Sequence, residues 1–167
     1  MKSLAGLQYV IPLFGLGLAS AQAQETAPAL AAAPAVVASA EQAGFVKSVR
    51  GDVQLHGSGG TLRPASAGEA VAASERIVTG PNSAAGLVLR DGTTLVVGPA
   101  SRLDLNSFSF DATTHAGGMF VSLLRGSLRM VTGLLGKTRP DSVRITTATA
   151  TIGIRGTDFI VEADEQP

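Results

Sequence analysis

The sequence lacks cysteine and tryptophan and holds few other aromatic residues. Its 167 residues include one Tyr and six Phe. The absence of cysteine excludes disulfides, thiol nucleophiles, zinc–thiolate sites and lipid attachment through cysteine. Thirteen Lys and Arg balance thirteen Asp and Glu, so the formal net charge is zero. A general nucleic-acid-binding protein is usually basic, so we expect no nucleic-acid partner.

Residues 1–23 have the layout of a secretory signal peptide. Lys2 supplies one positive charge, a mostly apolar run covers residues 4–19, and Ala-x-Ala steps follow up to Ala23. We expect cleavage after Ala23 and a mature protein outside the cytoplasm, periplasmic or secreted. The alternative is an uncleaved anchor, although the run is shorter than the ~20 apolar residues that span a bilayer. No later stretch is long enough, so we expect no transmembrane segment after cleavage.

Two further regions follow the signal peptide. Residues 24–43 are mostly Ala with Pro28 and Pro34, a composition typical of a linker. Residues 44–163 carry short Val-, Thr- and Leu-rich segments between Gly-containing turns. Their spacing predicts one compact all-β domain of roughly nine to eleven short strands, either a β-sandwich or a short β-solenoid.

The strands are expected at positions set by alternation and turn residues. We expect them around residues 44–50 and 53–55, at 76–79, on both sides of 91–92, and at 101–110, 118–131, 142–154 and 158–163. A phase change predicts a bulge near Asn106, and Gly126 is expected to break its strand. Residues 133–141 are expected to form a loop or helical turn whose two Leu cover an end of the core.

Asp91 and Gly92 give the clearest local signal. Asp-Gly is the favoured loop of a two-residue type I′ hairpin. Such a loop pairs Arg90 with Thr93, and the pairs further from the turn are apolar on both faces of the hairpin: Val88 with Leu95, and Leu87 with Val96. We therefore expect both faces of this hairpin to be covered.

No motif assigns catalytic, cofactor-binding or metal-binding residues. The two histidines, His56 and His115, are expected in loops and have no metal-ligand spacing. No nucleophile elbow or phosphate-binding loop is present. Basic residues outnumber acidic ones between Phe120 and Arg155, so an anionic envelope component is one conceivable partner, although ordinary solvated strand faces explain the same pattern.

Four segments resemble the FecR domain family of bacterial envelope proteins. In the family's order they are a Gly-Asp-Val opening in 44–55, a strand-and-hairpin stretch with Asp-Gly-Thr in 68–105, a Leu-rich strand with a central Gly in 121–130, and a terminal Arg-Gly-Thr-x-Phe signature in 143–161. The resemblance implies an all-β periplasmic module that contacts other proteins or envelope components.

The chain also departs from the family pattern. Ala148 stands where the family usually has proline. Members that regulate iron-uptake sigma factors carry a cytoplasmic segment and a membrane helix before the domain, and a signalling domain after it. This sequence starts with an export signal and has eleven residues after Gly156, so we expect neither part and do not transfer anti-sigma activity.

The signature residues Gly153, Arg155, Gly156, Thr157 and Phe159 raise a question of phase. Apolar residues occupy even positions up to Ile154 and odd positions from Phe159 onward. A strand in one phase cannot place both sets on the same face. We therefore expect a bulge or tight bend at 155–156, with Thr157 restarting the strand and the Arg155 donors bonding freed carbonyls. This interpretation treats the stretch as a structural closure.

Three functions stay open at this point. The first is an exported, non-catalytic module that binds an envelope protein or an anionic envelope component. The second is a signal-transduction component that works with a membrane-bound regulator or a TonB-dependent receptor. The third, and least supported, is a hydrolase of cell-wall or surface glycan, because no residues fill the named catalytic roles.

Overall fold

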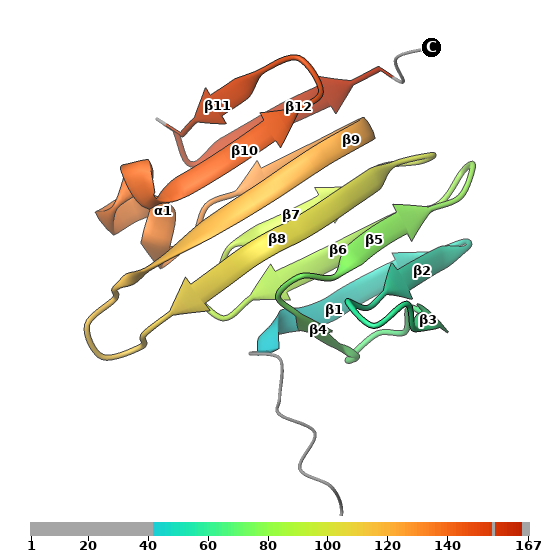
Figure 1. The fold of residues 1–167 in the computed structure, drawn as a ribbon, viewed down its shortest axis with the longest axis horizontal. Coiled ribbons are helices and arrows are strands. Elements are labelled where there is room, and N and C mark those ends of the chain that lie inside the picture. Colours follow the sequence, from blue (N-terminus) through green and yellow to red (C-terminus); the bar gives the residue numbers. More distant parts are fainter. Residues whose placement is uncertain (1–41, 155, 165–167) are drawn as a thin grey trace, which may run out of the picture. The chain divides into compact units, whose positions relative to one another are not determined.

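The computed structural model describes residues 42–154 and 156–164. The predicted signal peptide (1–23), linker residues 24–41 and Arg155 lie outside the described residues. The fold is all-β, as predicted (Figure 1). Its elements are β1 (Gln42–Arg50), β2 (Val53–His56), β3 (Leu62–Pro64), β4 (Ala70–Ala72), β5 (Arg76–Thr79), β6 (Ala84–Leu89), β7 (Thr94–Val97), β8 (Arg102–Phe110), β9 (Gly117–Val131), the helix α1 (Leu134–Thr138), the 3-10 turn η1 (Pro140–Ser142), β10 (Val143–Thr147), β11 (Thr151–Gly153) and β12 (Asp158–Ala163).

The strands form one curled sheet that folds over on itself. Nine of them pair in the order β3-β2-β5-β8-β9-β7-β6-β1-β4, and β10, β11 and β12 join next to β9. The long strand β9 serves both halves: residues 117–125 pair with β8 and β10, and residues 126–131 pair with β7 and β12. We call the half with β1, β4, β6, β7 and β12 sheet A, and the half with β2, β3, β5, β8, β10 and β11 sheet B.

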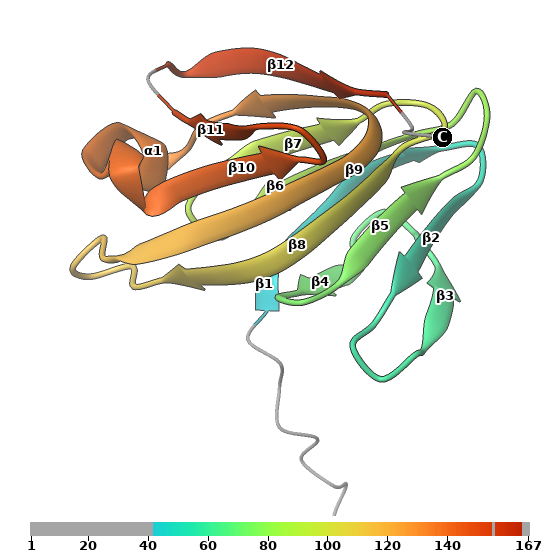
Figure 2. The ribbon, with the colours of Figure 1, turned by 45° about the horizontal axis from the view of Figure 1, so that its top comes forward.

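The curl favours the sandwich over the solenoid. All strand pairs are antiparallel among the described residues except β9–β10, whereas a solenoid stacks parallel strands. Alternate side chains of both halves form one core, with Leu55, Leu87, Leu103, Leu123 and Ile145 at most 1 % exposed. Figure 2 shows how the strands of the two halves curl over each other.

The chain crosses between the two halves of the sheet at turns, which we call corners, and two of these corners have the same sequence and the same hydrogen bond. Residues 80–83 and 98–101 both read Gly-Pro-x-Ser, and the third residue of each, Asn82 and Ala100, has a left-handed φ of 57° and 47°. In both corners the Ser hydroxyl donates to the Pro carbonyl, at 3.2 Å for Ser83 and 2.9 Å for Ser101. The repeat therefore makes the same turn twice, once from sheet B to A and once from A to B.

The serine of each corner also accepts a hydrogen bond from a second segment where the chain passes from one half of the sheet to the other. The Ser83 hydroxyl accepts the amide of Asp52 at 2.9 Å, where β1 turns into β2, and the Ser101 hydroxyl accepts the amide of Ser127 at 3.0 Å, where β9 bends. The residue before each of these amides is a glycine of positive φ, Gly51 at 72° and Gly126 at 87°. A Cβ on either glycine would strike the corner serine. Glycine is therefore required at positions 51 and 126, because each of these residues packs against a corner serine.

The two far ends of the curled sheet differ in chemistry. At the β3–β4 end, Arg63 donates to the carboxylates of Glu69 at 2.9 Å and Glu75 at 2.7 Å and to the carbonyl of Ala70 at 3.0 Å. These bonds connect the last strand of one half to the last strand of the other. The opposite end, at β11 and β12, has apolar side chains in the corresponding place and is described below.

The predicted type I′ hairpin at Asp91-Gly92 is wrong in register. Val88 pairs with Thr94 and Leu87 with Leu95, one residue away from the prediction. The amide of Gly92 donates to the Leu89 carbonyl, and Gly92 has φ of 84°, whereas Asp91 keeps a negative φ. This is the longer loop that follows a type I turn with a left-handed glycine.

One face of this hairpin is therefore solvated, contrary to our expectation. With the observed register, Leu87 and Leu95 share the core face, and Val96 points outward with 41 % of its surface exposed. The predicted register differs from the observed one by a single residue. A shift of one residue turns every side chain of that strand to the other face, which is why both faces were expected to be covered.

The Asp91 side chain explains the choice of loop. Its carboxylate is 2 % exposed and accepts the amide of Thr93 at 3.0 Å, the hydroxyl of Thr93 at 2.7 Å and the amide of Leu135 at 3.4 Å. The Thr93 hydroxyl in turn accepts the amide of Gly133 at 2.9 Å. The Asp-Gly-Thr motif thus fixes the segment that leads into α1, where Leu135 is buried and Leu134 is 40 % exposed.

Two other strand predictions had different outcomes. The bulge near Asn106 is confirmed, because the pairing of β8 with β9 shifts between Leu105 and Ser107. The continuous strand at 142–154 is wrong: residues 148–150 turn back, and β11 pairs antiparallel with β10. The Thr147 hydroxyl accepts the amides of Thr149 and Ala150 at 3.4 and 3.1 Å, and so makes a turn without glycine or proline.

The contact with the corner serine predicts a strong effect of Gly126→Ala. A Cβ there would lie 2.6 Å from the Ser101 Cα, so backbone must move, in addition to the left-handed φ. We expect a loss of more than about 3 kcal/mol in the free energy of unfolding, measured by urea denaturation. Gly60→Ala is the matched control, because Gly60 has φ of 76° and open space, and should cost about 1–2 kcal/mol. Equal losses in the two variants would contradict the corner contact.

The Asp91 network predicts a second stability effect. Asp91→Ala leaves buried donors of Thr93 and the Leu135 amide without an acceptor. We expect a loss of about 2–4 kcal/mol, since each unsatisfied buried donor costs ~1–3 kcal/mol. Asp91→Asn keeps one acceptor oxygen and should lose less. Wild-type thermal stability of Asp91→Ala would show that the loop does not depend on this carboxylate.

Candidate interaction site

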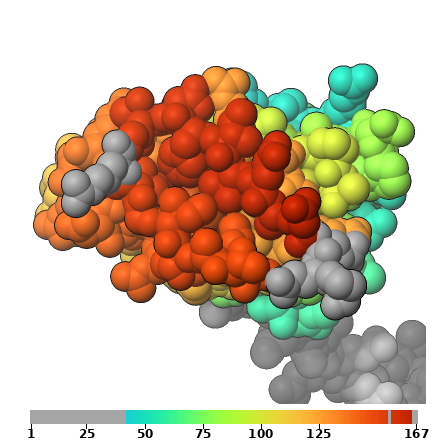
Figure 3. All heavy atoms as spheres, turned by 90° about the horizontal axis from the view of Figure 1, so that it is seen from above, coloured from blue at the N-terminus to red at the C-terminus, as the bar shows by residue number. Residues whose placement is uncertain are grey.

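The chain leaves sheet B and enters sheet A between Ile154 and Asp158. β11 pairs with β10 in sheet B, and β12 pairs with β9 in sheet A. Neither β11 nor β12 has a second strand beside it among the described residues. Both halves of the curled sheet therefore end here in an unpaired edge. Figure 3 shows the face formed by these C-terminal segments, coloured orange to red.

An apolar cavity lies between the two edges. It has a volume of about 360 Å³ and is lined by residues of β11, β12 and their connection: Ile152, Gly153, Ile154, Gly156, Phe159, Ile160 and Val161. Ile154 and Val161 are 4 % and 6 % exposed, and Ile152 and Phe159 are partly buried against the core. The apolar core thus reaches the surface at the β11–β12 end of the sheet, whereas the β3–β4 end is covered by ion pairs.

The structure places most residues of the expected signature in this cavity or beside it. The apolar residues before and after the phase change both face the core, but from different sheets, so the bend serves a change of sheet. The Thr157 carbonyl accepts the amide of Thr132 at 2.8 Å, just before β12 begins. No described atom lies within 4 Å of a Cβ built on Gly153 or Gly156. Steric crowding by the described residues therefore gives no reason for glycine at these two signature positions.

The outer face of sheet A exposes further apolar side chains. Ile160, Val96, Val131 and Phe45 have exposed fractions of 64 %, 41 %, 38 % and 44 %. The register places Ile160 and Val96 on either side of Arg129 in one row across the strands, and Val131 in the next row. Phe45 extends that next row through Val88. Several exposed apolar side chains on one face of a sheet favour a protein contact there.

Arg129 and Asp158 form an ion pair within this surface. The guanidinium donates to both carboxylate oxygens, Nε to Oδ1 at 3.0 Å and Nη2 to Oδ2 at 2.6 Å. These hydrogen bonds lower the pKa of Asp158 and raise that of Arg129. The pair connects β12 to β9 across the sheet at the start of the edge strand.

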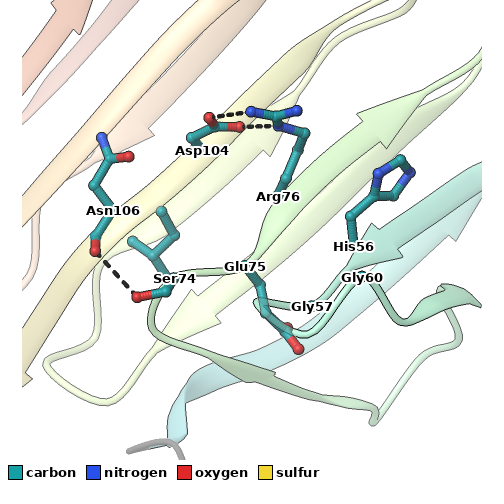
Figure 4. A pocket seen from close by; sticks show the side chains of 9 residues that line it. His56, Gly57, Gly60, Ser74, Glu75, Arg76, Asp104 and Asn106 are labelled. Atoms are coloured by element: carbon teal, nitrogen blue, oxygen red, sulfur yellow. Dashed lines mark hydrogen bonds and ion pairs between the residues drawn. The ribbon is translucent and has the colours of Figure 1, made fainter.

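A polar hollow of about 470 Å³ lies on the outer side of sheet B (Figure 4). The Arg76 guanidinium donates to both oxygens of Asp104 at 2.5 and 2.7 Å, and these bonds raise the pKa of Arg76. The Glu75 carboxylate accepts from Arg63. The Asn106 amide donates to the hydroxyl of Ser122 at 2.5 Å. Within the hollow Arg76 and Asp104 are thus paired with each other, and Glu75 is paired with Arg63 of β3.

The histidines lie apart in the topology. His56 ends β2 and lines the polar hollow, and its Nε2 is buried without a hydrogen-bond partner in the described part of the chain. His115 lies in the β8–β9 loop, with its ring stacked on Phe110 at a centroid separation of 6.2 Å. Within residues 42–154 and 156–164 no three His, Asp or Glu side chains gather as metal ligands. No helix in the same ranges is long and apolar enough to cross a membrane.

Sequence reasoning missed the edge surface, although its signal is present. In Asp158-Phe-Ile-Val-Glu162 the alternation that turns Phe159 and Val161 inward also turns Ile160 outward between two acids. An outward Ile on a strand that is expected to end the domain indicates a contact surface. The Gly-Pro-x-Ser repeat was equally visible and marks the crossings.

The Arg129–Asp158 pair predicts a pH effect. The unfolded pKa of an Asp is about 3.9, and the folded value is lower, so the pair stabilises the fold above the unfolded pKa and this contribution disappears as pH falls through the folded pKa. We expect Arg129→Met to raise the Asp158 pKa toward about 3.9 in a carboxyl-carbon NMR titration. The stability difference between Arg129→Met and wild type should shrink in acid. Identical Asp158 titrations in the two proteins would contradict the pairing.

Comparison with known proteins identifies the family of this chain. A family model described as "FecR protein" matches residues 75–167, more than half of the chain, and includes both β11 and β12. No curated protein matches. One solved structure, described as "Cell surface anchoring domain", is similar at 25% identity and a TM-score of 0.37, over 38% of this chain and 83% of that one. The chain therefore belongs to the FecR family.

Proposed function

We propose that this chain is an exported, non-catalytic module that binds another component of the cell envelope through its β11–β12 end. The observation that carries the proposal is the apolar cavity between two strand edges that pair with no further strand among the described residues. Unpaired edges and exposed apolar side chains favour association with another molecule, because both leave groups that a partner can satisfy. The candidate partners are an envelope protein and an anionic envelope component.

Membership of the FecR family supports the setting of this proposal. The family indicates a signalling-related periplasmic domain, and it is generally non-enzymatic. The predicted signal peptide at 1–23 agrees with export.

A second candidate function is a component of signal transduction. Family membership favours it: the domain would act with a membrane-bound regulator or a TonB-dependent receptor. The same β11–β12 end would serve as its contact. A sigma-factor or receptor gene beside this one would favour signalling, whereas a surface-protein or secretion gene would favour an envelope structural role.

The hydrolase alternative has the least support. It requires a histidine beside an available carboxylate and a bound glycan. His56 lines the same hollow as Glu75 and Asp104, but these carboxylates are bonded to Arg63 and Arg76. His115 lies near Asp111, and its ring stacks on Phe110. If the protein hydrolyses cell-wall glycan, a His56→Ala/His115→Ala double variant tests the histidines. Unchanged hydrolysis in that variant would remove their proposed role.

Affinity purification tests the proposed function. We expect the tagged mature protein to retain a specific component of envelope extracts, identified by mass spectrometry or glycan analysis, that the empty matrix does not retain. The partner should be lost when Ile152→Ser makes the lining of the cavity polar, in a variant whose circular dichroism stays that of the wild type. Retention of no specific component under several salt and detergent conditions would contradict the proposal.

A further inference from the structure

We infer that β12 takes one particular occupant: an extended segment of a partner protein that adds to the sheet as a strand and carries Lys or Arg on either side of an outward apolar residue. This inference rests on the proposed function and names the partner's chemistry. Three features of β12 lead to it: its unpaired backbone, its inward apolar side chains, and the acids on its outward side.

The backbone of β12 can pair with one more strand. Residues 158–163 pair in continuous register with residues 131–126 of β9, and β12 has no other neighbour in the part of the chain that the structure describes. A regular edge without a bulge or proline offers a row of amides and carbonyls to an added strand. An extended peptide binds such an edge through main-chain hydrogen bonds, and its alternate side chains give specificity.

The inward side of an added strand would complete the core. Phe159 and Val161 point inward and line the cavity of about 360 Å³, which residues of β11 line as well. The next strand in sheet A would project its own inward side chains over that cavity. Apolar residues are favoured at these positions, because they cover surface that Ile152, Ile154 and Val161 leave at the edge.

The outward side of β12 is acidic around an apolar centre. Ile160 is 64 % exposed, and Asp158 and Glu162 flank it on the same face. Asp164, also exposed, follows in phase. Arg129 pairs with Asp158. Three acids, Asp158, Glu162 and Asp164, thus follow one another on this face around Ile160. Opposite charges at facing positions stabilise strand pairing, and like charges oppose it.

The charges therefore decide between the possible occupants. A second copy paired antiparallel about Ile160 would place Asp158 of each chain opposite Glu162 of the other, and a parallel pair would align identical acids. An anionic envelope polymer would meet the same repulsion at this edge. A protein segment with Lys or Arg at the two flanking positions would meet complementary charge at both.

A capped heptapeptide tests this directly. Acetyl-Thr-Lys-Leu-Val-Leu-Lys-Thr-amide presents Val between two Lys on one face and Leu on the other, and its palindromic order serves both strand directions. We expect it to bind the full-length mature protein in isothermal titration calorimetry and to shift the backbone amide NMR signals of residues 158–163. The version with Glu in place of Lys should bind about tenfold or more weakly, and added salt should reduce the difference.

Matched variants assign the binding to β12. Ile160→Ser and Glu162→Lys should each weaken the Lys peptide about tenfold or more, whereas Leu62→Ser should not, although Leu62 on β3 is also 64 % exposed. Methylating the peptide's alternate amides removes main-chain donors and should abolish binding in one of the two alternations. All three substituted residues are exposed, so circular dichroism should show wild-type folding.

Several results would overturn the inference. These are equal binding of the Lys and Glu peptides, no binding of the Lys peptide at millimolar concentration, or equal effects of Ile160→Ser and Leu62→Ser. A concentration-dependent dimer that Ile160→Ser abolishes, seen by sedimentation, would make a second copy the occupant. If an envelope partner is purified but its binding is insensitive to Ile160→Ser and Glu162→Lys, the inference fails while the proposed function stands.

Discussion

The fold depends on the contact between Gly126 and Ser101. Among the described strands only β9 pairs in both halves of the curled sheet, and it bends where Gly126 lies against this serine. The Ser101 hydroxyl connects that bend to the Gly-Pro-x-Ser corner, whose backbone is bonded to the next corner through the Ala100 amide and the Gly80 carbonyl. If β9 ran straight, β7 and β12 could not lie over β8 and β10, and the core between them would open to water.

The sequence predicts the strands better than their partners. Alternation located β5 and β12 to the residue, because each side chain in a strand takes the face that its neighbours leave. Which strands pair, and in which register, depends on the turns between them. Here the turns depend on side-chain hydrogen bonds, which the alternation of apolar and polar residues does not reveal. Asp91 turns inward to bind Thr93 and moves the hairpin register by one residue, and Thr147 makes a hairpin in a stretch that contains no turn-forming residue.

The Ile-Arg-Gly-Thr stretch is a second case in which the sequence shows a change in pattern but does not show its structural cause. Its phase change was readable, since Ile154 and Phe159 are both apolar at positions of opposite parity. The cause was not readable, because a bulge within one strand and a move to another sheet produce the same pattern. The structure shows the move to another sheet, and with it a consequence that no local pattern contains: two strand edges end side by side with apolar residues between them.

An exposed, regular edge strand is a hazard for any β-protein, and acids on the edge are one protection against pairing with other copies. On β12, Asp158 and Glu162 supply that protection, yet Ile160 between them is as exposed as any large apolar residue in the described chain. Protection alone would not require an outward Ile, since a polar residue there would protect better. Acids around an apolar centre repel identical chains and favour a basic partner with the same spacing. The features that keep this edge from self-association therefore also make it selective.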